Sequence, residues 1–343
     1  MARVAFVERA PASGFMAGDL AAIESHFDAT VLRYERRPTI RFVLETLRAA
    51  WRDDAVYAFF ASEHALLPAL VFGALRKPFV VAPAGYDYAN LPEHGYGLAA
   101  NGRGWLPRLL ARRAAAIVTC SRAATAELLA LVPEVEGRVR LAPLGADPRA
   151  WADPTVDRNP QRVVTMGYVS LESWSRKGVD RFVAAAAADP DREYVLAGRV
   201  DAAVRSTLDA RRSPNLTVTG FLDHDEQRRL LWSAGVYTQL SWHESFGMAL
   251  LEAMLCGCVP VVTGVPALQE VAGPWAVTSS APEEDIDAII RAASASVDRA
   301  AMQADTAQRF PAAARADAVT GALDGALSAR RGRASRPRLQ SRR

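Results

Sequence analysis

Cysteine is scarce in this chain: only Cys120, Cys256 and Cys258 occur among its 343 residues. A low and odd number of cysteines argues against a disulfide framework and favours a reducing compartment such as the cytoplasm. Cys256 and Cys258 lie two positions apart, but no group of histidines or cysteines with zinc-ligand spacing accompanies them. We therefore interpret them as small buried residues and expect no metal site.

Long apolar runs are also missing. No stretch of about 18 uncharged apolar residues occurs, so we expect no transmembrane helix. The apolar part of residues 1–8 is too short for a signal peptide and predicts a first buried strand. A Walker-type lysine motif and a Gly-x-Ser-x-Gly elbow are absent, so neither the phosphate-loop nor the serine-hydrolase signature is present.

Charge is unevenly distributed along the chain. The whole sequence has 41 Lys and Arg against 38 Asp and Glu, but seven arginines and no acid lie in residues 329–343. The remainder is slightly acidic, which disfavours nucleic acid as a partner. We expect the Arg-rich tail, 329–343, to be disordered. It could contact anionic lipids peripherally at the inner membrane face, or it could be a solvated extension without a function.

Strand-like and helix-like segments alternate almost throughout, which predicts parallel sheets with crossover helices. The predicted strands are 4–7, 29–32, 56–60, 79–82, 116–119 and 139–141, then 162–166, 193–196, 216–218, 236–240, 259–262 and 275–278. A polar, proline-containing stretch at 147–160 separates the two sets and predicts a linker. We therefore expect an α/β protein with two tandem doubly wound Rossmann-like domains, with ligands at the carboxyl ends of the strands and in an interdomain cleft.

Residues 242–254, WHESFGMALLEAM, are the most informative segment. They lie between two predicted strands, and their helix would begin near Gly247, where unpaired N–H groups and the helix dipole favour a diphosphate. Glu252 follows Glu244 by eight residues, about two helical turns. Two acceptors at two depths suit an elongated, phosphate-centred ligand such as a nucleotide sugar. Taken alone, the two acids could also belong to an ordinary helix with an acidic start.

The longer string HESFGMALLEAMLCGCVPVVT, residues 243–263, resembles the Glu-x7-Glu signature of the retaining glycosyltransferases of family 4, which have the GT-B fold. Three other second-half segments are similar to the same family: 166–167 with 177–180, 215–222, and 264–271. The resemblance implies an acceptor-side domain at 1–158 and a donor-binding domain at 159–308. It also implies a helix at 309–328 that crosses back to the first domain.

The resemblance further implies a role for each matching residue. Glu244 contacts hydroxyls of the transferred sugar, Glu252 accepts from the ribose hydroxyls, and Lys177 neutralises the diphosphate. The other implied donor-binding residues are Ser245, Phe246 and Gly247, through backbone N–H groups, and Phe221, in a nucleotide-contacting loop. Independently of the family, breaking the anomeric C–O bond places charge on the diphosphate, which a cation and aimed N–H groups stabilise. Lys177 alone could also be a solvated residue at a helix start.

The second half departs from the family pattern at one position. The family usually has an arginine shortly after the glycine of its first loop, and Tyr168 stands there instead. Arg176, next to Lys177, and Arg199 are the candidates that could supply this second positive charge.

The first half departs from the pattern at a strand end. Ala84 replaces the histidine of the family's His-Gly-x-Asp segment, so Asp87, with Tyr86, is the candidate for the missing catalytic contact. His94 is an alternative from a nearby loop. The loop at 11–18 contains Gly14, which the resemblance places near the donor phosphates or the acceptor.

The resemblance therefore implies a retaining hexosyltransferase, and we expect one of polysaccharide biosynthesis. It would move a sugar from a nucleoside diphosphate sugar to an acceptor hydroxyl on a glycan, lipid or small molecule, without a cofactor or an obligatory metal. Two alternatives remain. One is a non-catalytic GT-B protein that binds a nucleotide or glycan for a partner enzyme, and the other is a nucleotide-sugar epimerase of the same fold.

Overall fold

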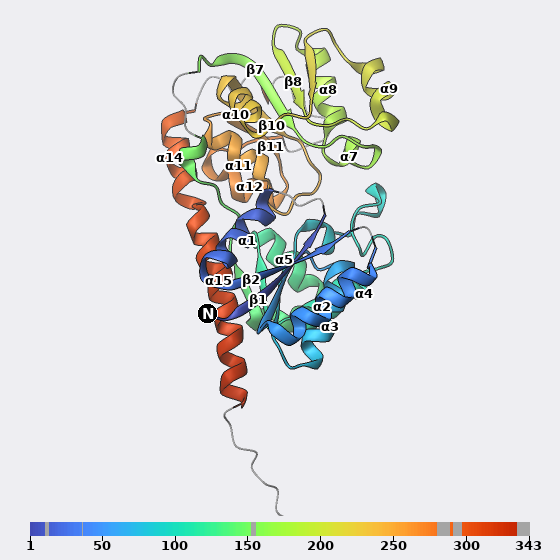
Figure 1. Ribbon diagram of the computed structural model, residues 1–343. Helices are drawn as coiled ribbons and strands as arrows, with labels where there is room; N and C mark the ends of the chain where they lie inside the picture. Colours follow the sequence, from blue (N-terminus) through green and yellow to red (C-terminus); the bar gives the residue numbers. More distant parts are fainter. Residues whose placement is uncertain (11–13, 36, 152–155, 280–288, 291–296, 335–343) are drawn as a thin grey trace, which may run out of the picture. The chain divides into compact units, whose positions relative to one another are not determined.

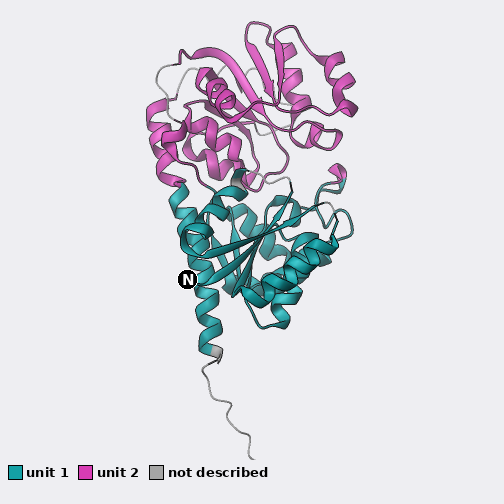
Figure 2. Cartoon of the chain, in the orientation of Figure 1, with its two compact units in different colours: residues 1–92, 96–144, 312–343 teal, residues 93–95, 145–311 magenta. Residues whose placement is uncertain are grey.

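Two six-stranded parallel sheets organise the chain in the computed structural model (Figure 1). The structure describes residues 1–343 except 11–13, 36, 152–155, 280–288, 291–296 and 335–343. Contacts divide the chain into unit 1, residues 1–92, 96–144 and 312–343, and unit 2, residues 93–95 and 145–311 (Figure 2). Short 3-10 helices occur at Gly85–Asp87, Pro92–His94, Pro133–Arg138 and Gly273–Trp275.

Unit 1 is built on a sheet with the strand order β2-β1-β3-β4-β5-β6. Its strands are β1 Arg3–Arg9, β2 Asp28–Tyr34, β3 Ala55–Phe59, β4 Phe79–Ala82, β5 Ala116–Thr119 and β6 Val139–Leu141. Its helices are α1 Gly14–His26, α2 Ile40–Arg52, α3 Glu63–Ala74, α4 Trp105–Arg113, α5 Arg122–Leu131 and α15 Ala312–Ala334. Helix α1 begins directly after residues 11–13, and its Met16 is buried.

Helices cover both faces of this sheet, so its central strands are apolar along their whole length. Because successive side chains point to opposite faces, Val7 joins a core that includes Phe42 of α2 and Phe72 of α3, whereas Phe6 joins a second core. The second core includes Ile23 of α1 and Leu323 of α15. The last helix therefore completes the core of unit 1.

A buried ion pair joins α15 to α1 within unit 1. The Arg315 guanidinium donates to both carboxylate oxygens of Asp19, at 2.9 and 2.7 Å, and to the carbonyl of Ala142 at 2.6 Å. Asp19 also accepts a hydrogen bond from the hydroxyl of Tyr57. Residues 329–334, which we predicted to be disordered, continue this helix. The rest of the Arg-rich tail lies outside the described residues.

Unit 2 has the strand order β12-β11-β10-β7-β8-β9, which, counted from β7, is the 3-2-1-4-5-6 order of dinucleotide-binding sheets. Its strands are β7 Asn159–Met166, β8 Glu193–Ala197, β9 Leu216–Gly220, β10 Ala234–Gln239, β11 Val259–Thr263 and β12 Val277–Ser279. Its helices are α6 Pro148–Trp151, α7 Leu171–Arg176, α8 Val179–Ala188, α9 Ala202–Arg211, α10 His224–Ser233, α11 Met248–Leu255, α12 Pro266–Ala272 and α14 Arg299–Arg309.

The division between the units differs from the sequence prediction of 158/159. It falls between Leu144 and Gly145, and unit 2 ends at Pro311. The reason is that the segment around α6 packs on α10: the indole N–H of Trp232 donates to the carbonyl of Trp151 at 2.7 Å. In the described part of the chain, no helix is long and apolar enough to cross a membrane.

Candidate functional site

The strand order of unit 2 reverses between β7 and β10, and ligands of doubly wound sheets bind at the carboxyl ends of such strands. The loop after β10 ends at Gly247, where α11 begins. Gly247 has φ +106°, and a Cβ there would lie 3.0 Å from the Leu268 side chain. A glycine is therefore required for the backbone to turn into this helix.

Glu244 is held in this loop by three donors. Its Oε1 accepts hydrogen bonds from the Gln239 amide at 2.9 Å and the Ser241 hydroxyl at 3.0 Å, and it forms an ion pair with the Lys177 ammonium. Burial alone would raise the pKa of this carboxyl, but Lys177 and the two hydrogen bonds lower it below its ordinary value. Glu244 is therefore ionised at neutral pH.

Lys177 reaches Glu244 because the backbone beside it fits closely against the loop after β10. Gly178 has φ +68°, and a Cβ at this position would lie 2.1 Å from the carbonyl oxygen of Leu240. The backbone N–H of Trp242 donates to the carbonyl of Arg176 at 2.8 Å. The structure thus brings together Lys177 and Glu244, two of the predicted catalytic residues, and it explains why glycine follows the lysine.

Glu252 lies half-buried on α11, and its Oε2 accepts a hydrogen bond from the Gln227 amide of α10 at 2.9 Å. Burial raises the pKa of the Glu252 carboxyl to about 7, against the opposing effect of that hydrogen bond. Its protonation state therefore changes close to neutral pH.

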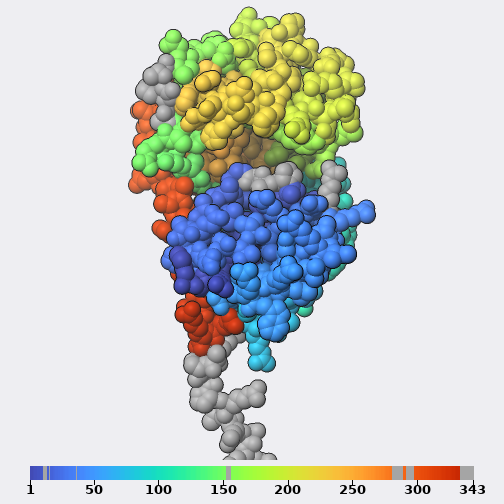
Figure 3. Space-filling view, in the orientation of Figure 1, coloured from blue at the N-terminus to red at the C-terminus, as the bar shows by residue number. Residues whose placement is uncertain are grey.

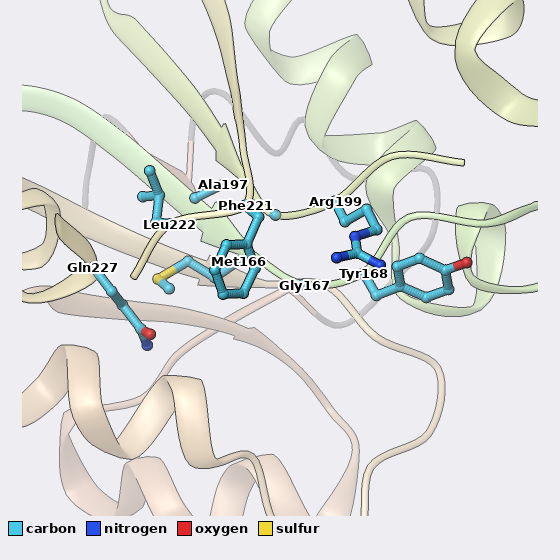
Figure 4. A pocket seen from close by; sticks show the side chains of 9 residues that line it. Met166, Gly167, Tyr168, Ala197, Arg199, Phe221, Leu222 and Gln227 are labelled. Carbon is cyan, nitrogen blue, oxygen red and sulfur yellow. The ribbon is translucent and has the colours of Figure 1, made fainter. Parts of the chain in front are cut away.

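A pocket of about 410 Å³ opens beside Gln227, at the carboxyl ends of β7, β8 and β9 (Figure 4). It is lined by Met166, Gly167, Tyr168, Ala197, Gly198, Arg199, Phe221, Leu222 and Gln227. Gly198 has φ +137°, and a Cβ there would lie 1.9 Å from the carbonyl oxygen of Gly167, so the two strand ends are in direct contact. The predicted residue Phe221 belongs to this wall.

The two candidates for the second positive charge differ in position. Arg199 is exposed and lines the pocket. The side chain of Arg176 is only 8% exposed and lies 3.6 Å from Glu172. Tyr168, which replaces the family's arginine, donates its hydroxyl to Asp201 at 2.5 Å. Arg199 is therefore the better placed of the two.

The remaining predicted residues, Asp87 and Gly14, belong to unit 1. Asp87 is 1% exposed, and its Oδ2 accepts from the backbone N–H groups of Ala61 at 2.8 Å and Ala84 at 3.0 Å. Burial raises the pKa of this carboxyl to about 7, although both N–H groups act to lower it. Asp87 ties the loops after β3 and β4 together. Gly14 is the exposed first residue of α1, and the preceding residues 11–13 lie outside the described part.

Sequence reasoning missed three polar residues of this site: Gln227, Gln239 and Ser241. Gln239 carried a usable signal, because it is a polar side chain at the end of an apolar strand that leads into the glutamate loop. Gln227 carried none, because its partner Glu252 is on a different helix and 25 residues away.

The family model for glycosyl transferases group 1 matches residues 166–316. Over 124 residues, 35% of this chain, the sequence is 34% identical to the GDP-mannose-dependent alpha-(1-6)-phosphatidylinositol dimannoside mannosyltransferase of Mycobacterium tuberculosis strain H37Ra. That stretch is 31% of the relative, so the chain matches about a third of the length of its curated relatives.

Among solved structures, Anabaena HepE in complex with UDP is similar, with a TM-score of 0.76, 17% identity, and coverage of 95% of this chain and 100% of that chain. HepE with UDP and glucose has a TM-score of 0.74 at the same identity and coverage. A Rickettsia africae glycosyltransferase has a TM-score of 0.69 and 12% identity, over 98% of this chain and 99% of that chain. The fold is therefore GT-B, with two Rossmann-like domains, as predicted.

Proposed function

We propose that this chain is a retaining glycosyltransferase of family 4, which moves a hexose from a nucleoside diphosphate sugar to an acceptor hydroxyl. The observation that carries the proposal is the Lys177–Glu244 pair. Glu244 lies in the loop that leads from β10 into α11, and Lys177 reaches it from the turn between α7 and α8, so a cation and a carboxylate lie together near the N-terminus of α11. The group 1 family match over this unit supports the assignment.

In this proposal the donor occupies unit 2. The pocket beside Gln227 receives the base and ribose, with Glu252 accepting from ribose hydroxyls. The diphosphate lies between Lys177 and the backbone N–H groups of Ser245, Phe246 and Gly247, which lead into α11. Arg199 adds a second charge at the pocket wall. Glu244 then orients the hexose through its hydroxyls.

The reaction breaks the bond between the anomeric carbon and the diphosphate oxygen. The bonding electrons go to that oxygen, where the Lys177 ammonium and the helix N–H groups stabilise the charge. The acceptor hydroxyl attacks the same face of the sugar, and the departing phosphate takes its proton. Because Lys177 supplies the positive charge, we expect a chelator to leave the activity unchanged.

The donor can be identified by thermal shift against a panel of nucleoside diphosphates and their sugars. The curated relative is GDP-mannose-dependent and the HepE crystals hold UDP, so guanosine and uridine diphosphate hexoses come first in the panel. A ligand at about 100 times its dissociation constant stabilises a fold by roughly 2.7 kcal/mol, which such a panel detects.

The decisive test is release of free nucleoside diphosphate when the protein is mixed with its donor and candidate acceptors. A glycosyltransferase releases it together with a new glycoside whose anomeric configuration matches the donor. Donor binding without release would instead identify a non-catalytic binding protein, which the replacements Ala84 and Tyr168 favour. A changed sugar on an intact nucleotide would identify an epimerase.

A further inference from the structure

Unit 1 contains a second and larger pocket, of about 970 Å³. It lies where β4 and β5 begin, at the opposite end of these strands from the loops that Asp87 ties together. Its walls are the turn after α3, the connection from α4 to β5, the β6 region, and α15. Figure 3 shows the turn after α3 in cyan and the last turns of α15 in red at the same end of this unit.

The walls of this pocket are strongly basic. Six cationic residues line it: Arg76, Lys77, Arg113, Arg138, Arg140 and Arg330. None of the described residues along its walls is acidic. Asp54 lies 4.0 Å from Arg330 and offsets that charge in part. The neighbouring cations are close enough to affect one another, because burial and Arg330 both lower the pKa of Lys77. We call this the basic pocket.

Four of these cations donate hydrogen bonds to backbone carbonyls, among them Arg140 to Val139 at 3.0 Å and Arg330 to Asp54 at 3.2 Å. Arg138 donates to the carbonyls of Ala114 at 2.6 Å and Arg112 at 2.9 Å. Lys77 donates to the carbonyl of Asp53 at 2.5 Å. Carbonyls orient the side chains without neutralising them, and a guanidinium has five donors, so N–H groups remain for a ligand. The charges of the basic pocket are therefore preorganised, and the nearby carboxylates of Asp53 and Asp54 offset them only in part.

Arg76 occupies a position that favours glycine. It follows the C-terminus of α3 and has φ +55°. The backbone N–H of Arg76 donates to the carbonyl of Gly73 at 2.9 Å, and the backbone N–H of Lys77 donates to the carbonyl of Phe72 at 2.9 Å. This is the Schellman arrangement, in which the left-handed residue is usually glycine. An arginine here costs stability and adds a charge to the pocket.

The wall formed by α15 leaves room for a ligand. Gly321 and Gly325 lie one turn apart and line the pocket, and a Cβ added at either meets no atom within 4 Å. Glycine weakens a helix relative to alanine. At these two positions α15 therefore places no side chain in the pocket, which leaves space for a ligand.

We propose that the basic pocket binds a phosphate-bearing anion, as a site of unit 1 that is separate from the donor site proposed for unit 2. Arginine guanidinium groups pair with phosphate oxygens through two parallel N–H bonds, and several arginines around one cavity suit a diphosphate or a phosphate ester. The phosphate can come from a free anion or from a phospholipid headgroup. This inference does not depend on the activity proposed above.

The first test is isothermal titration with pyrophosphate, using full-length chains that all carry Lys177→Gln to weaken the donor site. Arg113→Gln with Arg140→Gln removes two exposed pocket charges, and we expect binding to weaken at least tenfold. The matched control is Arg205→Gln with Arg211→Gln on α9, two exposed arginines of unit 2. This control should leave pyrophosphate binding unchanged, because it removes the same number of charges from a surface outside the basic pocket.

Two single variants separate binding from folding. Arg76→Gly should weaken pyrophosphate binding while the melting temperature stays equal or rises, because glycine suits the left-handed position. Gly325→Leu retains every charge but fills the cavity, so it should also weaken binding. A simple loss of folding would lower the melting temperature in both.

Cosedimentation with phosphatidylglycerol vesicles, against phosphatidylcholine vesicles, distinguishes the two sources of phosphate. Vesicle binding that the pocket variants reduce and the α9 control does not would identify the headgroup as the ligand. Pyrophosphate binding alone with the same dependence would identify a free anion. If neither probe distinguishes the pocket variants from the control, the proposal is wrong. Nucleoside diphosphate release by an Arg113→Gln/Arg140→Gln protein that keeps Lys177 reports separately on the proposed transferase.

Discussion

At the scale of single residues, the Lys177 ammonium and the Glu244 carboxylate form an ion pair with each other. The resemblance assigned both to a donor, one to its phosphates and one to its sugar. A diphosphate that binds Lys177 must therefore compete with Glu244. Because of this competition, we expect a substitution of Glu244 to change turnover and diphosphate affinity in different ways.

Glu244→Gln should lower turnover by about 100-fold, because a misplaced reacting group costs rates of that order. The same change releases Lys177 from its ion pair, so the affinity for free nucleoside diphosphate should stay equal or increase. Turnover and diphosphate titration measure the two effects. Glu24→Gln, at an exposed position of α1, is the control. A parallel loss of turnover and affinity would contradict this account.

Glu252 predicts a pH dependence of donor binding. The pKa of its carboxyl is raised to about 7 by burial, so it is largely protonated at pH 6 and ionised at pH 8. Hydroxyl groups donate more strongly to the ionised form. Affinity for the nucleotide sugar should therefore rise from pH 6 to pH 8, and Glu252→Gln should abolish the rise while weakening binding. Titration calorimetry at several pH values measures both.

Glu244 and Glu252 were predicted from one long and specific string, and Lys177 from a shorter segment at 177–180; their roles stay predictions. Their partners were not. Gln239 and Ser241 converge on Glu244 only once β10 and its loop are folded, and Gln227 reaches Glu252 from another helix. Asp87 was assigned from a motif position, and its hydrogen bonds to two loops depend on the packing of β3 beside β4.

At the scale of elements, the Lys-Gly turn between α7 and α8 determines where the cation lies. Its position depends on the contact between Gly178 and the Leu240 carbonyl, which leaves no room for a side chain. A short helix, α7, precedes this turn, and sequence periodicity did not indicate it because it has only six residues. Strands were easier to predict, because their apolar runs are bounded by polar turns.

Gly178→Ala should destabilise the protein by about 1–3 kcal/mol, since it combines a left-handed backbone with a collision against Leu240. It should also weaken nucleoside diphosphate binding, because Lys177 moves with the turn. Urea denaturation and calorimetry measure the two effects. Gly18→Ala on α1, where a Cβ meets no atom within 4 Å, should be neutral or stabilising. Equal behaviour of the two variants would contradict the close approach.

At the scale of the whole molecule, alternating elements and one specific motif were enough to predict the GT-B fold, and the structure confirms it. The division between the units was less predictable. The polar composition at 147–160 suggested a linker, but Trp151 is buried and packs with α10, so the first part of that stretch belongs to unit 2. Amino-acid composition does not reveal with which of the two units a short connecting helix will pack.

Arg315→Met should destabilise unit 1 by about 3–5 kcal/mol, because it leaves the buried Asp19 carboxylate without its cation. Urea denaturation, followed by a probe in unit 1, measures the change. Arg41→Met removes an exposed ion pair with Glu45 on α2 and should cause no measurable change. A small effect of Arg315→Met would show that apolar packing alone holds α15.

The core of unit 1 includes Val319, Leu323 and Leu327, which follow residue 144 by roughly 180 positions. A ribosome adding about 5–20 residues per second needs on the order of 10–40 s to synthesise that interval. During this time the nascent first unit exposes the apolar groove that α15 later fills, whereas unit 2 emerges as an almost continuous segment. Unit 2 should therefore mature first, and the growing chain should need a chaperone over that groove until α15 has been synthesised.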